Sequence, residues 1–411
     1  MAANPALITP PASALRLLAT APHRLLFCIG ATNVLLAMTW WAVWLVDARW
    51  QLFDLAQPAI PAGWLHAMLM QYQMLPSFMF GFLLTVFPRW MNLAALKPSH
   101  YVPVGVGLLG GQLTTIAGLF AGAMWLKVGA LLTFCGWAIG TALLARLSYR
   151  DRGRTWHAVS CVFALSFGLL GLTAYVLYLQ SLDARLMFVA IKIGSIAVLL
   201  PIYFTVCHRM IAFFASGVIA NYRVSRPMWT LAAFWLFALA HTWLELRHAY
   251  AWLWLADVPM LALGAGLLWL WSPRSAMPGL LRVLFVGFAW LPIAFALYAF
   301  QSLWFMNTGV FVLGRAPAHA LFIGFFGSLL VAMVTRVTQG HSGRPLVLGN
   351  VAAFAFALVQ LVTLTRIAAE LAPDSLMWQC IGAIGWLAAF MPWVVRSVWI
   401  YCTPRADGRE G

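Results

Sequence analysis

Apolar runs of about 20 residues or more recur along the whole chain, and short polar segments rich in proline, glycine and arginine separate them. An α-helix of this length spans the hydrocarbon core of a bilayer. The pattern therefore predicts an all-α integral membrane protein with a single polytopic domain over residues 1–411. We expect twelve transmembrane helices, near residues 24–46, 64–87, 101–121, 124–147, 156–179, 186–211, 228–247, 249–271, 281–303, 317–337, 346–369 and 376–401.

The composition agrees with this prediction. Hydrophobic residues make up 64% of the chain and charged residues 9%, whereas a soluble domain carries about 25% charged residues. The short alternating segments of a membrane β-barrel are absent. The net charge of +15 does not indicate nucleic-acid binding, because the basic residues occupy short loops between apolar runs. The six cysteines are scattered without a CxxC pair, which favours small buried apolar side chains over a disulfide framework.

The basic residues also predict an orientation. With twelve helices, 18 of the 25 Lys and Arg residues fall on the side that holds both termini, and 7 fall on the other side. The positive-inside rule then places both termini in the cytoplasm. The first apolar run, 25–46, is too long for a signal-peptide core and lacks a small-residue cleavage site, so we expect it to remain as a spanning helix.

This topology sorts the histidines by depth. His66, His241 and His319 fall in the second, seventh and tenth predicted helices, towards their outer ends, whereas His341 belongs to the cytoplasmic side. A helix rises 1.5 Å per residue, so His319 and His341 lie roughly 30 Å apart. They cannot share one metal ion, and we expect one polar cluster at each face. The remaining histidines divide between the two sides, with His248 outside and His23, His100, His157 and His208 inside.

The second predicted helix offers a set of candidate metal ligands. His66, Met70, Gln73 and Met74 follow the spacing that places residues on one helical face. Imidazole suits copper, iron and zinc, and thioether sulfur suits Cu(I) or haem iron. The alternative is that Met70 and Met74 fill a helix interface. An ionisable residue within a membrane span is by default a functional hypothesis, which favours His66 as a ligand.

Two further features concern helix geometry. Pro76 removes a backbone donor, so we expect a free carbonyl at Tyr72 and a kink in the second helix. Gly324, Gly327 and Ser328 would let a neighbouring helix or a flat cofactor approach the tenth helix closely.

The seventh predicted helix carries a second candidate ligand. His241, Glu245 and His248 share one face. Glu245 would either orient a ligating His241 or form an interfacial pair with Arg247 or His248. His241 is the third candidate for the outer cluster, beside His66 and His319.

The cytoplasmic end of the tenth helix is the densest polar stretch. We expect the helix to end at Thr335, because Gly340, Gly343 and Pro345 oppose helix continuation and favour a tight turn. This turn would gather Arg336, His341 and Arg344. The arginines would clamp an anion or a haem propionate; the alternative is an ordinary basic loop.

Arg209 is a further basic candidate, at the inner end of the sixth helix. Its neighbours Cys207 and His208 point in other directions, so the three do not form a ready-made ligand set. Arg209 would either pair with a propionate or another anion, or extend to the membrane surface.

Several stretches resemble one family. HALFIGFFGSLLVAMVTRVTQGHSGRPL (319–346) is similar to the signature of the NnrS family, which comprises bacterial membrane proteins of the nitric oxide response. APHRLLF (21–27), GFLLTVFPRW (81–90) and GFAWLPIAFAL (287–297) resemble other family segments in the same order, and HRMIAFFAS (208–216) is a looser match.

The resemblance implies a twelve-helix inner-membrane protein that contains haem and copper and helps the cell, often a denitrifying bacterium, to cope with nitric oxide. It implies site roles for His66, His319, Arg336, His341 and Arg344. Met70, His241 and Arg209 are candidates from the residue pattern alone.

This chain also departs from the family pattern. Met68 and Leu69 replace a His and a Glu, Phe285 replaces a frequent His, and Ala212 replaces a Pro. One metal is then lost, or Met68 or Met70 substitutes for a histidine ligand.

Two classes of function follow. The first is a membrane protein whose haem or copper, held near the outer face, meets nitric oxide that arrives through the lipid. The second is a permease for a metal, haem or small solute, which predicts an inverted repeat between helices 1–6 and 7–12. No such repeat is evident in the sequence. A scaffold in which the histidines only bridge helices is a third, weaker alternative.

Overall fold

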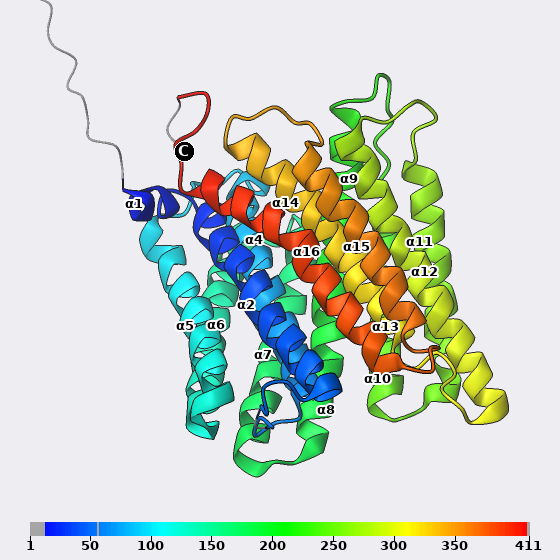
Figure 1. The fold of residues 1–411 in the computed structure, drawn as a ribbon. Helices are drawn as coiled ribbons and strands as arrows, with labels where there is room; N and C mark the ends of the chain where they lie inside the picture. The colour runs from blue at the N-terminus through cyan, green and yellow to red at the C-terminus, as the bar shows by residue number, and fades with distance from the viewer. Residues whose placement is uncertain (1–12, 56, 409–411) are drawn as a thin grey trace, which may run out of the picture.

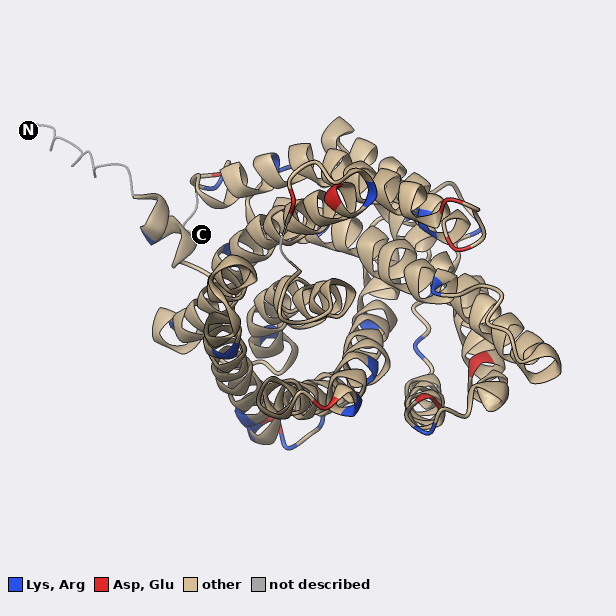
Figure 2. Ribbon diagram, turned by 60° about the horizontal axis from the view of Figure 1, so that its bottom comes forward, with Lys and Arg blue, Asp and Glu red and all other residues tan. Residues whose placement is uncertain are grey.

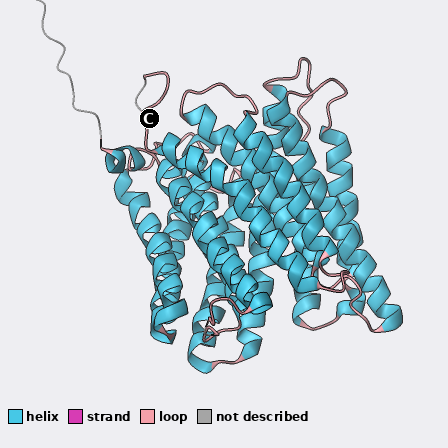
Figure 3. Ribbon diagram, viewed as in Figure 1, coloured by secondary structure: helices cyan, strands magenta, loops and turns pink. Residues whose placement is uncertain are grey.

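The computed structural model describes residues 13–55 and 57–408, and within them the protein consists of helices and loops without a β-strand (Figure 3). The elements are α1 (Ala14–Leu18), α2 (Pro22–Trp50), α3 (Ala62–Met68), η1 (Leu69–Met74), α4 (Leu75–Trp90), α5 (Pro98–Ala121), α6 (Ala123–Arg150), α7 (Trp156–Ser181), α8 (Ala184–Lys192), η2 (Ile193–Leu199), α9 (Leu200–Ser216), α10 (Met228–Leu246), η3 (Tyr250–Trp252), α11 (Trp254–Trp271), α12 (Gly279–Thr308), α13 (Ala316–His319), η4 (Ala320–Gly327), α14 (Ser328–His341), α15 (Asn350–Ala368) and α16 (Ser375–Tyr401). The all-α fold predicted from the apolar runs is confirmed.

Eleven helices among the described residues are long and apolar enough to cross a membrane, and each coincides with a predicted span. The other predicted span, 228–247, is the helix α10, which carries His241 and Glu245 and is not among the eleven. Both side chains are buried inside the protein. The count of twelve spans stays a prediction.

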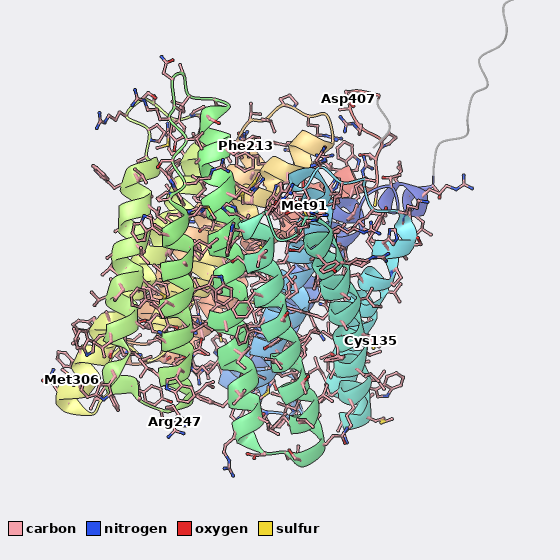
Figure 4. All side chains as sticks on the ribbon, turned by 180° about the vertical axis from the view of Figure 1, so that it is seen from behind. Met91, Cys135, Phe213, Arg247, Met306 and Asp407 are labelled. Atoms are coloured by element: carbon pink, nitrogen blue, oxygen red, sulfur yellow. The ribbon has the colours of Figure 1, made fainter. Side chains whose placement is uncertain are left out.

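The bundle has two distinct faces. Helix α1 and the last turn of α16 lie on the same face (Figure 1), which we call the inner face. Asp407, Met91 and Phe213 lie towards this face, and Arg247 and Met306 lie towards the opposite, outer face (Figure 4). The cytoplasmic location of the inner face remains a prediction.

Three spans in the described chain contain a π-helical segment. They are residues 62–90 with η1, residues 184–216 with η2 and residues 316–341 with η4. When α10 is counted together with the eleven candidate spans, each of the three follows the previous one at an interval of four. We call them the inner helices, because 94%, 61% and 72% of their most apolar 18-residue stretches are buried inside the protein. The corresponding share in the other candidate spans is 33–56%. Viewed obliquely from the outer face, the bundle shows helices arranged around others that lie inside it (Figure 2).

The inner helices share details that point to an internal repeat. Two of them carry a histidine in the first turns, His66 or His319, and the π-helical segment ends eight positions later, at Met74 or Gly327. The period is therefore four spans rather than the six that a permease with an inverted repeat requires. Because four is an even number, successive repeats have the same orientation in the bundle.

Pro76 has the local effect that the sequence predicts. The Tyr72 carbonyl, four residues earlier, has no intrahelical donor, and it accepts a hydrogen bond of 2.8 Å from the Trp137 indole N–H of α6. The segment η1 spreads the disturbance over the preceding turn, as π-helical insertions do. The predicted free carbonyl is thus confirmed, and it fixes α6 against the most buried inner helix.

The contact between α6 and α7 gives a test of this packing. A Cβ atom at Gly168 of α7 would overlap the Trp137 indole, which is held in place by the Tyr72 carbonyl. We expect Gly168→Ala to lower the free energy of unfolding by about 1–3 kcal/mol, because the interior tolerates overpacking poorly. Thermal unfolding of the detergent-solubilised protein measures this.

Gly266 of α11 is the matched control, since an added Cβ there meets no atom within 4 Å. Gly266→Ala should be neutral or stabilising by up to about 1 kcal/mol through helix propensity. Equal losses for the two variants would contradict the proposed packing.

Candidate functional site

The outer ends of two inner helices bring His66 and His319 into one polar cluster. His66 lies in α3 and His319 ends α13, while Arg366 near the end of α15 is close enough to interact electrostatically with both imidazoles. Glu370 follows Arg366 by one helical turn, and its Oε1 lies 3.6 Å from NH2 of Arg366. We call these four residues the outer cluster.

His319 is held in one orientation within the outer cluster. Its Nδ1 lies 3.0 Å from the Arg315 carbonyl oxygen, so Nδ1 carries the proton and donates. Its Nε2 then accepts a hydrogen bond of 3.0 Å from NH2 of Arg366. The lone pair that could bind a metal is therefore directed at a guanidinium group.

His66 has a freer environment. Its ring stacks on Trp41 of α2, with the centroids 4.4 Å apart and the planes inclined by 10°. Its buried Nδ1 has no hydrogen-bond partner among the described residues. An unpartnered buried nitrogen costs free energy, so this atom is available to a ligand that the protein would bind here.

The predicted ligand face of the second helix does not form. The segment η1 starts at Leu69, and its wider turn shifts every later residue around the axis. Met70 is buried, and Gln73 donates to the hydroxyls of Thr115 and Thr133, 3.0 Å from each, instead of extending the His66 face. The expectation that the spacing aligns His66 with Gln73 is wrong, because regular α-helical geometry stops one turn after His66.

His241 lies in a second buried cluster at the outer end of α10. Its Nδ1 is 2.6 Å from Oδ1 of Asp257 in α11, and its Nε2 is 3.6 Å from Oε2 of Glu245. Glu245 also accepts from Lys192 of α8 at 2.6 Å. We call these four residues the ionic cluster, since all four are ionisable.

The ionic cluster changes two expectations. Glu245 pairs with Lys192 and His241 rather than with Arg247 or His248, and Asp257 is the acceptor nearest to His241. None of the contacts of His241 among the described residues involves His66 or His319. The structure thus brings together two of the three predicted outer histidines.

At the inner face, the tenth predicted helix is longer than expected. Helix α14 continues through Arg336 to His341, because Gly340 keeps helical geometry and the first left-handed residue is Gly343, with φ of 68°. Arg336 therefore lies in the helix, five residues before His341, and does not belong to the turn that follows.

The predicted arginine clamp around His341 is accordingly not formed. The guanidinium of Arg336 lies 4.1 Å from the ring centroid of Phe214, and that of Arg209 lies 4.4 Å from the ring of Trp90. Both contacts join one inner helix to another through cation–π attraction. Arg344 lies 5.2 Å from the ring of Trp399.

Tryptophan rings from neighbouring helices pack against two glycines of the tenth span. A Cβ atom at Gly324 would lie 2.6 Å from the Trp290 ring, and one at Gly327 would lie 3.5 Å from the Trp386 ring. The Trp290 indole donates to Gln360, which in turn donates to Ser328. This face packs against neighbouring helices and leaves no room for a flat cofactor.

The donor chemistry of the outer cluster can be compared with haem and with a bare ion. A zinc site usually has three or four protein ligands, and the described residues contain no group of three His, Cys, Asp or Glu side chains arranged to hold a metal ion. Haem needs one or two side-chain ligands from the protein, and the imidazoles of His66 and His319 would be the candidates. Arg366, now hydrogen-bonded to His319, is suited to pair with a propionate.

A cofactor also needs a cavity large enough to hold it. An apolar cavity of about 60 Å³ lies between α2, α4, α9 and α14, lined in part by Phe78 and Tyr203, and none of its lining residues belongs to the outer cluster. Cofactor sites measure about 300–1,000 Å³. The outer cluster has donors suited to haem, but Arg366 must withdraw from His319 before that imidazole can bind a metal.

Sequence reasoning missed three residues that decide these sites. Arg366 and Glu370 stand one turn apart in an apolar run, and Asp257 follows a short loop. Ionisable residues in membrane spans are functional candidates by default, which would have identified all three. Their pairing with particular histidines has no signal in the sequence.

The fold and the buried polar clusters define a multi-pass α-helical membrane protein with ionisable groups at the outer ends of its inner helices. The family model described as NnrS protein matches residues 17–405, nearly the whole chain. The chain therefore belongs to the NnrS family, the membrane-protein family of the nitric oxide response. No curated protein matches the sequence.

Proposed function

We propose that the protein acts in the response to nitric oxide in a bacterial cytoplasmic membrane and holds haem iron at the outer cluster. The observation that carries the proposal is the placement of His66 and His319 at equivalent positions of two inner helices, in one cluster with Arg366. His66 and His319, which come from separate helices, would be the side chains that hold haem iron here.

Each residue of the outer cluster then has a role. His66 contributes a nitrogen that is free of other partners, and its stacking on Trp41 fixes the ring plane. The Arg315 carbonyl holds the Nδ1 proton of His319, which leaves Nε2 as the ligating atom. Arg366 turns from His319 to an acidic group of the cofactor, and Glu370 supports it. Haem, when bound, supplies an iron that binds nitric oxide.

Access for the gas needs no aqueous channel. Nitric oxide is small and weakly polar, and the outer cluster lies among apolar helices at one membrane boundary. A site at this depth takes up its ligand from the lipid phase.

The optical spectrum and metal content of the purified protein test the proposal. Cells supplied with both haem and copper should yield protein with a haem absorption band, near one haem per chain, that shifts when nitric oxide is added. Protein that contains copper but no haem would indicate a copper site in place of the proposed haem site. Protein that contains neither metal would refute it.

A permease is the alternative function. It predicts an inverted repeat between the two halves of the chain, whereas the π-helical segments recur every four spans in the same orientation. Uptake of labelled haem or copper into vesicles that contain the protein would support this alternative.

A further inference from the structure

A third polar cluster lies at the inner face, where four segments distant in sequence meet. His23 starts α2, His341 ends α14, and their ring centroids are 4.3 Å apart. NH1 of Arg89, near the end of α4, lies 3.5 Å from Nε2 of His341. Arg405 donates to the His341 carbonyl at 3.0 Å. We call these four residues the inner cluster.

The inner cluster has an excess of positive charge. Arg24, Arg89 and Arg405 all lie close enough to His23 to interact with it electrostatically. Asp407 pairs with Arg405 through contacts of 2.9 Å and 2.6 Å, so it balances one of these three charges. Two guanidinium charges therefore remain in excess over this carboxylate, even with both imidazoles neutral.

Arg24 and Arg405 are fixed by the backbone around them. NH1 of Arg24 donates to the carbonyls of Tyr401 and Thr403 at the end of α16. The segment after α16 then folds over His341, because the Ala406 N–H donates to the Ser342 carbonyl at 2.9 Å. The position of Asp407 at this end of the molecule is visible in Figure 4. The cluster is thus held in place by hydrogen bonds from several segments.

His23 provides the observation that points to a ligand. Its side chain is only 4% exposed, and its Nδ1 has no hydrogen-bond partner within the part of the chain that the structure describes. It also stands in the first turn of α2, which contains no acidic residue. The His23 N–H donates to the Thr85 hydroxyl at 3.1 Å, so the helix contributes its dipole rather than a free backbone donor. The N-terminus of a long helix attracts negative charge.

We propose that the inner cluster binds a phosphate-type anion, either a free phosphate or the headgroup of an anionic phospholipid. Arg89 and the His341 imidazole supply side-chain donors, His23 supplies the unpartnered nitrogen, and the excess positive charge and the helix N-terminus supply the attraction. A tetrahedral oxyanion offers acceptors in several directions, which suits donors that converge from three segments. This site is separate from the outer cluster and does not depend on the proposed haem.

Binding can be measured with both anion sources on the full-length protein. Inorganic phosphate is titrated calorimetrically into protein held in a zwitterionic detergent. In a parallel arm, protein from bilayer discs containing phosphatidylglycerol is examined by native mass spectrometry for retained lipid. Saturable binding in the first arm identifies a free anion, and retained phosphatidylglycerol in the second identifies a lipid headgroup.

Arg89→Gln should weaken whichever binding is seen by about tenfold or more, because it removes a charge-assisted donor. Arg89→Lys keeps the positive charge, so it should bind the anion better than Arg89→Gln does. This comparison keeps the test valid if Arg89→Gln folds poorly. Arg274→Gln is the control, since Arg274 is an exposed arginine in the loop after α11 on the same face. Absence of saturable binding in both arms would overturn the proposal, as would equal losses in Arg89→Gln and Arg274→Gln.

Discussion

His319→Ala should abolish haem binding, whereas His341→Ala should retain it. His319 supplies one of two imidazoles in the outer cluster, and no other described histidine lies in that cluster to replace it. His341 lies at the other end of the same span, beside His23 and Arg89. The loss in His319→Ala should be large, because the substitution removes one of the two imidazoles that would hold the iron and also the hydrogen-bond partner of Arg366. Haem content per chain and the absorption spectrum measure the effect.

Two controls separate loss of a ligand from loss of the fold. His66→Ala should reproduce the effect of His319→Ala, and both variants should elute as the wild type does in size-exclusion chromatography. His241→Ala should keep its haem, because Asp257 and Glu245 enclose that ring. Loss of haem in both His319→Ala and His341→Ala, with the fold intact, would contradict the separation of the two clusters.

Lys192→Met should destabilise the protein by about 3–5 kcal/mol. Glu245 is almost fully buried, and its carboxylate pairs with Lys192 at 2.6 Å. Removal of one partner leaves the other charge buried without compensation, which is the costly case for an internal ion pair. Thermal unfolding in detergent, with the wild type at the same lipid content, measures the loss.

The double variant Lys192→Met with Glu245→Gln identifies the cause. It removes both charges, so it should recover more than half of the stability lost in the single variant. Lys127→Met is the matched control, since Lys127 contacts Gln180 at an exposed position and its loss should cost no more than about 0.5 kcal/mol. A double variant as unstable as Lys192→Met would show that the lysine contributes through packing rather than charge.

The sequence determined the elements of this fold. All twelve predicted spans coincide with helices, and eleven of these are long and apolar enough to cross a membrane. The polar breaks between them are loops, because a bilayer is spanned by helices of about 20 apolar residues. The length of the tenth span also separated His319 from His341. The effect of Pro76 on the Tyr72 carbonyl followed from covalent structure alone.

The tertiary structure decided which polar groups meet. The wider turn of η1 moved Gln73 away from the face of His66, although their spacing fits a regular helix. Arg366 contacts His319, and Asp257 contacts His241. Each contact joins two helices, and the sequence does not specify that these helices are neighbours. In a chain that is 64% hydrophobic, almost any helix face can pack against another. The few buried ions must find partners in the interior, so the assembled bundle, rather than the spacing along any one helix, sets the composition of each site.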